Sequence, residues 1–198
     1  MPSDPIGRAR RITSPDEAIG VYADWAASYD DDVFETLGFT GTDRIADLLA
    51  DHLPGRDVPV LDLGCGTGAA GVRLRQHGFT MIDGIDISPQ MLAVAAGKGV
   101  YRQLVVGDLT APLPIAPASY GASVSAGTFT TGHVGPAALP GIVGVLAPGA
   151  VVAWVIGAAS WPTFEQALAS TPLEVVAATR ERIWPGGDDE AIMLVARR

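Results

Sequence analysis

Short apolar runs that alternate with helical segments constrain this chain more than any other feature. The runs are expected as strands at residues 58–63, 79–85, 102–106, 121–125, 150–156, 173–184 and 191–196. Helical segments are expected at 69–77, 89–97, 136–145 and 163–169. Strand–helix–strand repeats close through right-handed crossovers into a parallel sheet. The sequence therefore predicts an α/β fold with a Rossmann-like, doubly wound sheet of seven strands.

The end of the chain departs from this repeat. Only the polar turn around Pro185-Gly186-Gly187 separates the last two apolar runs, so these runs should pair antiparallel and not through a helix. An all-parallel sheet is typical of dinucleotide-binding domains. A mostly parallel sheet with an antiparallel C-terminal strand is expected here.

The first part of the chain has a different character. Residues 1–15 mix Pro, Ser, Arg and Gly without periodicity, and we expect a flexible tail there. Amphipathic helices are predicted over 15–27 and from an N-cap at Thr42 to just before Pro54. The chain thus divides into the tail and a single domain over 16–198, with an N-terminal helical lid over about 16–54.

A glycine-rich turn follows the first predicted strand. It carries Asp62, Gly64, Gly66 and Gly68 in the run Asp-Leu-Gly-Cys-Gly-Thr-Gly. Glycines permit positive φ and let a ligand approach the backbone. A nucleotide is the usual ligand, but Gly64-x-Gly66-x-x-Ala69 also fits the dinucleotide fingerprint.

Three carboxylates decide between these ligands. Asp62, Asp86 and Asp108 end successive strands, so the crossovers should bring them to one edge of the sheet. A matching ligand offers a cation to Asp62, a vicinal diol to Asp86 and a hydrogen-bond donor to Asp108. S-adenosylmethionine has its ammonium, ribose and adenine amino group in that order, whereas Asp62 would repel a pyrophosphate.

These motifs resemble the class I S-adenosylmethionine-dependent methyltransferases over almost the whole chain. Asp62 to Gly68 resembles the first motif of that family, Asp86 its ribose-binding acid, Gly107-Asp108-Leu109 its adenine-contacting segment and 146–150 its Leu-Lys-Pro-Gly-Gly turn. The segment from Tyr22 to Asp30 and Gly132-His133-Val134 most resemble the branch related to the Williams-Beuren syndrome region methyltransferase. Tyr120-Gly121, Ala147 and Ala150 depart from the family pattern, at positions that carry no chemistry.

The resemblance assigns site residues. The methyl donor, S-adenosylmethionine, is expected to contact Tyr22, Trp25, Tyr29, Asp62, Gly64, Cys65, Gly66, Gly68, Asp86, Ile87, Met91, Gly107, Asp108, Leu109, Ser125, Ala126 and Gly127. The acceptor is expected beside Thr128, Phe129, Thr130 and Trp161, with His133 as a candidate general base. A structural or capping histidine is commoner than a general base, whereas Tyr22, Trp25 and Tyr29 could equally be core packing or a lid over the donor. Trp161 and Trp184 could line an acceptor pocket, although large aromatic residues are more often core or lid packing.

Composition narrows the partners. A formal charge of −9 repels polyanions, so a small-molecule acceptor is expected and a nucleic acid is not. Cys65 is the single cysteine, and the three histidines lack ligand spacing, so no metal site is expected. No apolar run approaches the roughly 20 residues that span a bilayer, and we expect a cytoplasmic protein without membrane contact. The oligomeric state is left open.

Two alternatives remain beside an enzyme that methylates an oxygen, nitrogen or sulfur nucleophile. One is a module that binds S-adenosylmethionine without catalysis. The other is a nicotinamide-dependent oxidoreductase that uses the glycine turn.

Overall fold

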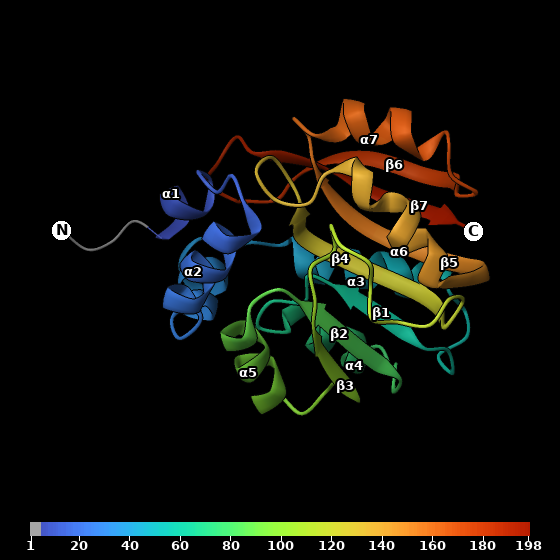
Figure 1. Cartoon of the computed structure of the whole chain (residues 1–198), viewed down its shortest axis with the longest axis horizontal. Helices are drawn as coiled ribbons and strands as arrows, with labels where there is room; N and C mark the ends of the chain where they lie inside the picture. Colours follow the sequence, from blue (N-terminus) through green and yellow to red (C-terminus); the bar gives the residue numbers. More distant parts are fainter. Residues whose placement is uncertain (1–4) are drawn as a thin grey trace.

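The computed structural model describes residues 5–198, which form a layered α/β structure around one sheet (Figure 1). The seven strands lie in the order β3-β2-β1-β4-β5-β7-β6. They are β1 (Val60–Leu63), β2 (Ile82–Asp86), β3 (Gln103–Val106), β4 (Tyr120–Phe129), β5 (Leu146–Gly157), β6 (Glu174–Arg182) and β7 (Glu190–Arg197). The first five pair in parallel, and β7 pairs antiparallel with both β5 and β6. The predicted fold class is confirmed, including the antiparallel end of the sheet.

Helices cover both faces of the sheet. They are α3 (Gly41–His52), α4 (Ala69–Gln76), α5 (Pro89–Gly97), the 3₁₀ turn η2 (Pro136–Ala138), α6 (Leu139–Val145) and α7 (Trp161–Leu168). Side chains of a strand alternate between the two faces. Val60 accordingly packs in the cluster with α3 and α4, whereas Leu61 and Leu63 pack in the cluster with α6 and α7. Because of this alternation, the side chain of Asp62 lies on the same face of the sheet as that of Val60.

Strand β4 is longer than the predicted run of 121–125, and beyond that run the Thr128 hydroxyl donates to the Leu63 carbonyl at 3.1 Å. The Ser125 hydroxyl donates to the Leu63 carbonyl at 2.8 Å, and the Trp154 indole donates to the Ser123 hydroxyl at 2.9 Å. A polar group that is hydrogen-bonded costs little to bury. The strand extends to Phe129, with an irregular register after Ser125.

The N-terminal part packs as helices beside the sheet edge, at the left of Figure 1. It contains α1 (Pro5–Ala9), α2 (Pro15–Trp25) and the π-helical turn η1 (Asp31–Thr36). Residues 5–15 were expected to belong to a flexible tail, but α1 lies within them and both Ala9 and Ile12 are buried. Residues 1–4 of that tail lie outside the described residues. The turn η1 was missed because its acidic run has no apolar period.

Caps fix the helix starts. Ser14 accepts from the Glu17 amide at 3.3 Å, and the Glu17 carboxylate accepts from the Thr13 amide at 2.8 Å, which is a reciprocal capping arrangement. The predicted cap at Ser88 is confirmed, since its hydroxyl accepts from the Met91 amide. The helix predicted behind Thr42 instead begins at Gly41, after Thr40.

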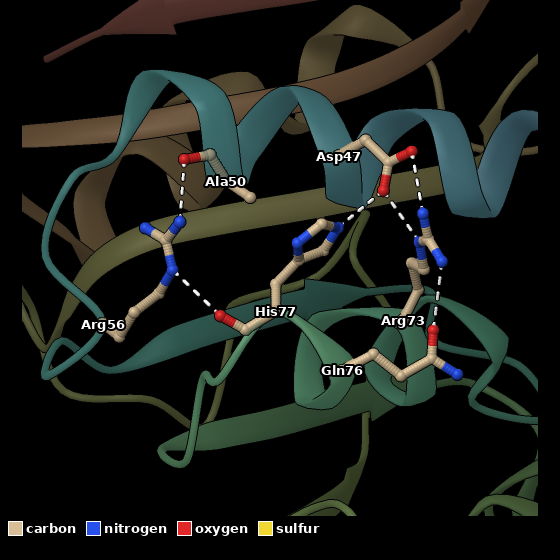
Figure 2. A network of polar contacts seen from close by, with 6 residues as sticks. All are labelled: Asp47, Ala50, Arg56, Arg73, Gln76 and His77. Carbon is tan, nitrogen blue, oxygen red and sulfur yellow. Dashed lines mark hydrogen bonds and ion pairs between the residues drawn. The ribbon is translucent and has the colours of Figure 1, made fainter.

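A polar network fastens α3 to α4 on the outer face (Figure 2). The Asp47 carboxylate accepts from Arg73 Nε at 2.7 Å and lies 2.6 Å from His77 Nε2. Arg56 donates to the carbonyls of Ala50 at 3.0 Å and His77 at 3.1 Å, which ties the loop before β1 to the end of α4. The contacts hold both ends of the segment that contains β1 and the glycine turn.

Candidate active site

A cavity of about 240 Å³ opens at the carboxyl ends of the central parallel strands. In open α/β sheets ligands bind at this edge. Fourteen of the residues predicted from the sequence line it: Tyr22, Tyr29, Gly64, Gly66, Asp86, Ile87, Met91, Gly107, Asp108, Leu109, Ala126, Gly127, Thr128 and His133. The cavity therefore brings most of the predicted site together.

The glycine turn between β1 and α4 forms one wall. Gly64 and Gly66 have φ of 65° and 53°, a backbone region that favours glycine. A Cβ on Gly64 would lie 2.1 Å from the Thr128 hydroxyl, so no side chain fits there. A Cβ on Gly66 would meet nothing within 4 Å, and this residue lines the cavity. The turn thus leaves backbone open to a ligand.

Asp86 holds the turn in this shape. Its carboxylate accepts from the Gly66 amide and from the Ser88 amide, both at 2.8 Å. Burial raises the pKa of the Asp86 carboxyl, and the hydrogen bonds from Ser88 and Gly66 oppose that rise. The same carboxylate lines the cavity, so it can also accept from hydroxyl groups of a ligand.

Asp108 lies on the neighbouring wall, directly after β3. Its Oδ1 accepts from the amide and the hydroxyl of Thr110, at 2.8 and 2.7 Å. Asp108 and Thr110 both line the cavity. These bonds fix the carboxylate where it can accept from a donor group in the cavity.

Asp62 does not join this row. It is 1% exposed, is absent from the cavity lining and accepts from the Tyr101 hydroxyl at 2.7 Å. Burial raises the pKa of Asp62 to about 7, although the hydrogen bond from Tyr101 lowers it. Strand alternation explains the difference, because Asp62 shares a face with Val60, and Tyr101 packs on that face. The row expected from the sequence contains Asp86 and Asp108 only.

Other predicted residues also lie outside this cavity. Gly68 packs against Tyr101, and Ser125 holds the Leu63 carbonyl. Cys65 is buried beside Gly84, and burial raises the pKa of its thiol well above the ordinary value, which makes it a poor nucleophile. Trp161 begins α7 and packs against the core cluster beneath it.

A second, larger cavity of about 530 Å³ adjoins the first. The two share Tyr22, Tyr29, Gly127 and His133 in their linings. Three further predicted residues line only the second cavity: Trp25, Phe129 and Thr130. The site therefore has two compartments with a common wall.

His133 lies in the wall that the two cavities share. Its Nδ1 lies 3.3 Å from the Thr131 carbonyl, which can only accept, so Nδ1 carries the proton. Nε2 then accepts from the Tyr22 hydroxyl at 2.8 Å. Burial lowers the pKa of His133 and raises that of Tyr22. A neutral imidazole with a basic nitrogen thus sits between the compartments.

The segment after α2 is tied to the glycine turn through one carboxylate. Asp30 accepts from Lys98 Nζ at 2.7 Å and from the Thr67 hydroxyl at 2.5 Å. Asp30 follows Tyr29, which lines both cavities. These contacts hold Tyr29 in the wall that the two cavities share.

Several lining residues were not predicted. The segment that caps α2 contributes Thr13, Ser14, Pro15 and Ala18, and Thr110, Gly132 and Val134 complete the first cavity. The capping pattern at Thr13 to Glu17 was visible in the sequence, but its position over the sheet edge was not. In the second cavity, Phe39 was not predicted either; its ring contacts that of Trp184, which the sequence had suggested as a residue of an acceptor pocket.

Part of the chain that contains this site matches a known protein family. Residues 60–149 match the family described as methyltransferase domain. The chain is 33% identical over 150 residues to the human (Homo sapiens) methyltransferase-like protein 27, covering 74% of this chain and 60% of that protein. It is 39% identical over 66 residues to the 18S rRNA (guanine-N(7))-methyltransferase of Bos taurus, covering 33% and 23% of the two chains. The chain thus spans about 60% of the human relative and a smaller part of the bovine one.

Solved structures share the fold. The cyclase SpnF superposes with a TM-score of 0.76 at 15% identity, over 94% of this chain and 97% of that chain. The 1,6-didemethyltoxoflavin-N1-methyltransferase of Burkholderia thailandensis superposes with a TM-score of 0.70 at 19% identity, over 94% and 91%. One fold therefore carries proteins named for different reactions, and the reaction has to be argued from the site.

Proposed function

We propose that the chain is an S-adenosylmethionine-dependent methyltransferase that methylates a small-molecule acceptor; residues 60–149 match the methyltransferase domain family, and the chain shares its fold with S-adenosylmethionine-dependent methyltransferases. The observation that carries the proposal is the pair of adjoining cavities with His133 and Tyr22 in their common wall. The first cavity holds the donor and the second holds the acceptor.

The first cavity fits S-adenosylmethionine. Asp86 offers its carboxylate to the ribose hydroxyls, and Asp108 offers its own to the adenine amino group. The open backbone at Gly66 admits the methionine end without a side chain in the way. Ile87, Met91 and Leu109 supply apolar contacts for the flat adenine ring. Asp62 takes no part, because its carboxylate faces Tyr101.

A nicotinamide dinucleotide fits this cavity less well. A pyrophosphate binds the free backbone amides of a glycine turn at a helix N-terminus. Here the Gly66 amide already donates to the Asp86 carboxylate, which would also repel the phosphates. A binding module without catalysis would need no acceptor compartment, and the second cavity disfavours that alternative.

The second cavity favours a small molecule over RNA as acceptor. Its volume of about 530 Å³ lies within the roughly 300–1,000 Å³ usual for small-molecule pockets. Its rim carries Asp188, Asp189 and Glu190, and the chain as a whole has a formal charge of −9, both of which repel phosphates. Some relatives are named for rRNA, so RNA is the competing acceptor that an experiment has to test.

Further parts of the assignment stay predictions. They are the branch resembling the Williams-Beuren syndrome region methyltransferase, a cytoplasmic location and the absence of a nucleic-acid partner. Within residues 5–198, no helix is both long and apolar enough to cross a membrane.

The protein's part in the reaction is orientation and proton handling. When bound, S-adenosylmethionine supplies a methyl group on a positively charged sulfur, and the sulfur keeps the bonding electrons as the thioether S-adenosylhomocysteine. Gly127 leaves the passage between compartments open, and the aromatic lid excludes water. A proton released by the acceptor atom passes through the Tyr22 hydroxyl to His133 Nε2, which burial keeps neutral.

Transfer of a labelled methyl group tests the proposal. The purified chain is given S-adenosylmethionine labelled in its methyl group, together with either the small-molecule fraction of a cell extract or total RNA. We expect S-adenosylhomocysteine to form, with the label in a small molecule. Label that enters only RNA would refute the acceptor assignment, and no S-adenosylhomocysteine with either fraction would refute the activity.

A further inference from the structure

We propose that the second cavity takes a ring-bearing acceptor with a cationic amine at the end remote from the methylated atom. This inference rests on the proposed function, since it names the substrate class of the same site. The residues that line this cavity include an aromatic group, an acidic turn and a set shared with the first cavity.

The body of the cavity is aromatic. Trp25 contacts Tyr22 and Tyr29, with ring centroids 6.3 and 4.6 Å apart. Phe39 and Trp184 contact each other, with centroids 4.9 Å apart, and line the same cavity. Aromatic rings bury large apolar area, and their faces attract cations. A flat apolar molecule is the ligand that such walls hold best.

One turn that lines the cavity is acidic. Asp188, Asp189 and Glu190 lie at the turn between β6 and β7 and line the cavity, where Arg10 is their only basic neighbour in the described lining. Arg10 pairs with Asp189 at 2.5 Å, and Glu190 pairs with Arg180 at 3.2 Å. Among the described residues Asp188 is the carboxylate of this turn that no arginine pairs with, and its charge favours an ammonium group and disfavours a carboxylate or phosphate.

The part of the lining that the second cavity shares with the first is the part next to the donor. Gly127, Tyr22 and His133 belong to both linings, whereas the acidic turn belongs only to the second. An acceptor that spans the cavity places its nucleophile beside His133 and its cation near the acidic turn. Its two functional groups are therefore separated by an apolar ring.

Three isosteric phenols test the charge at the acidic end. Tyramine ends in an ammonium, 4-(2-hydroxyethyl)phenol in a neutral hydroxyl and 4-hydroxyphenylacetate in a carboxylate. Binding of each is measured by calorimetry on the whole chain, with and without saturating S-adenosylhomocysteine. We expect tyramine to bind roughly tenfold more tightly than the neutral phenol, with the anion weakest.

Variants then locate the preference. Asp188→Asn combined with Asp189→Asn should remove the preference for tyramine and leave the affinity for S-adenosylhomocysteine unchanged. Asp24→Asn, an exposed acid outside both linings, is the matched control and should keep the preference.

The outcomes separate the two proposals. Equal binding of tyramine and the neutral phenol, tighter binding of the anion, or no binding of any of the three overturns the substrate class. A preference that survives in the double variant overturns its assignment to the acidic turn. Failure to bind S-adenosylhomocysteine overturns the proposed function, while the probe measurements without it still judge the charge preference.

Discussion

Replacing the buried carboxyl of Asp62 by an amide should change how stability depends on pH. Asp62→Asn keeps an oxygen that accepts from the Tyr101 hydroxyl but cannot ionise. In the folded protein burial raises the pKa of Asp62 from its usual 3.8 to about 7. The folded state therefore prefers the protonated carboxyl, and ionisation at neutral pH destabilises it.

The sign and size follow from linkage between proton binding and folding. Because the folded-state pKa lies above the unfolded value, this carboxyl stabilises the fold most at low pH and loses its contribution as pH rises through about 7. The separation of the two pKa values corresponds to about 4 kcal/mol in full. About 2 kcal/mol of it should be lost between about pH 5.5 and about pH 8.

Urea denaturation of the ligand-free protein across that range measures the effect. The unfolding free energy of the wild type minus that of the variant should fall by about 2 kcal/mol as pH rises. Glu181→Gln is the control, since Arg44 holds the pKa of Glu181 below its usual value and its difference should stay constant over this range. A flat or rising difference for Asp62→Asn would refute the placement of this carboxyl beneath the glycine turn.

Three further changes have defined outcomes. Gly71→Ala should lower the unfolding free energy by about 2 kcal/mol in denaturation experiments, because its Cβ would lie 2.3 Å from the Tyr101 hydroxyl oxygen. Asp30→Asn should weaken calorimetric binding of S-adenosylhomocysteine roughly threefold to tenfold, since it releases Lys98 from the lid. His133→Gln should remove the acid limb of kcat/KM, which in the wild type should lie below pH 6.5 because burial lowers the pKa of His133.

Two of these changes have a control variant, and for the third one result would contradict the prediction. Gly20→Ala in α2, where a Cβ meets nothing within 4 Å, should raise stability by up to about 1 kcal/mol. Asp31→Asn, an exposed neighbour of Asp30, should leave affinity unchanged. An acid limb that persists in His133→Gln would assign the proton transfer to another group.

Much of the fold was predictable because strands and helices have residue patterns that are local in the sequence. The βαβ repeats, the Ser88 cap and the antiparallel end all follow from short-range patterns. The N-terminal helix α1 and the π-helical turn η1 were missed, since α1 is stabilised by contacts with α2 and not by its own periodicity.

The positions of the strand ends at the site were predictable, but the directions of their side chains were less so. Strand ends correctly placed Asp86 and Asp108 on one edge, because right-handed crossovers fix where strands end. They could not tell that Asp62 faces Tyr101, a partner 39 residues away that belongs to a different crossover. Phe39 could not be found either, since only the folded chain brings it beside Trp184 in one cavity.

Titration calorimetry with S-adenosylmethionine and S-adenosylhomocysteine measures whether the first cavity binds the methyl donor. The wild type should bind both ligands, NAD should not bind, and Asp86→Asn should weaken both affinities strongly while the variant still melts cooperatively. Binding of NAD, or no binding of either S-adenosyl compound to the folded wild type, would contradict the assignment of this cavity to the methyl donor.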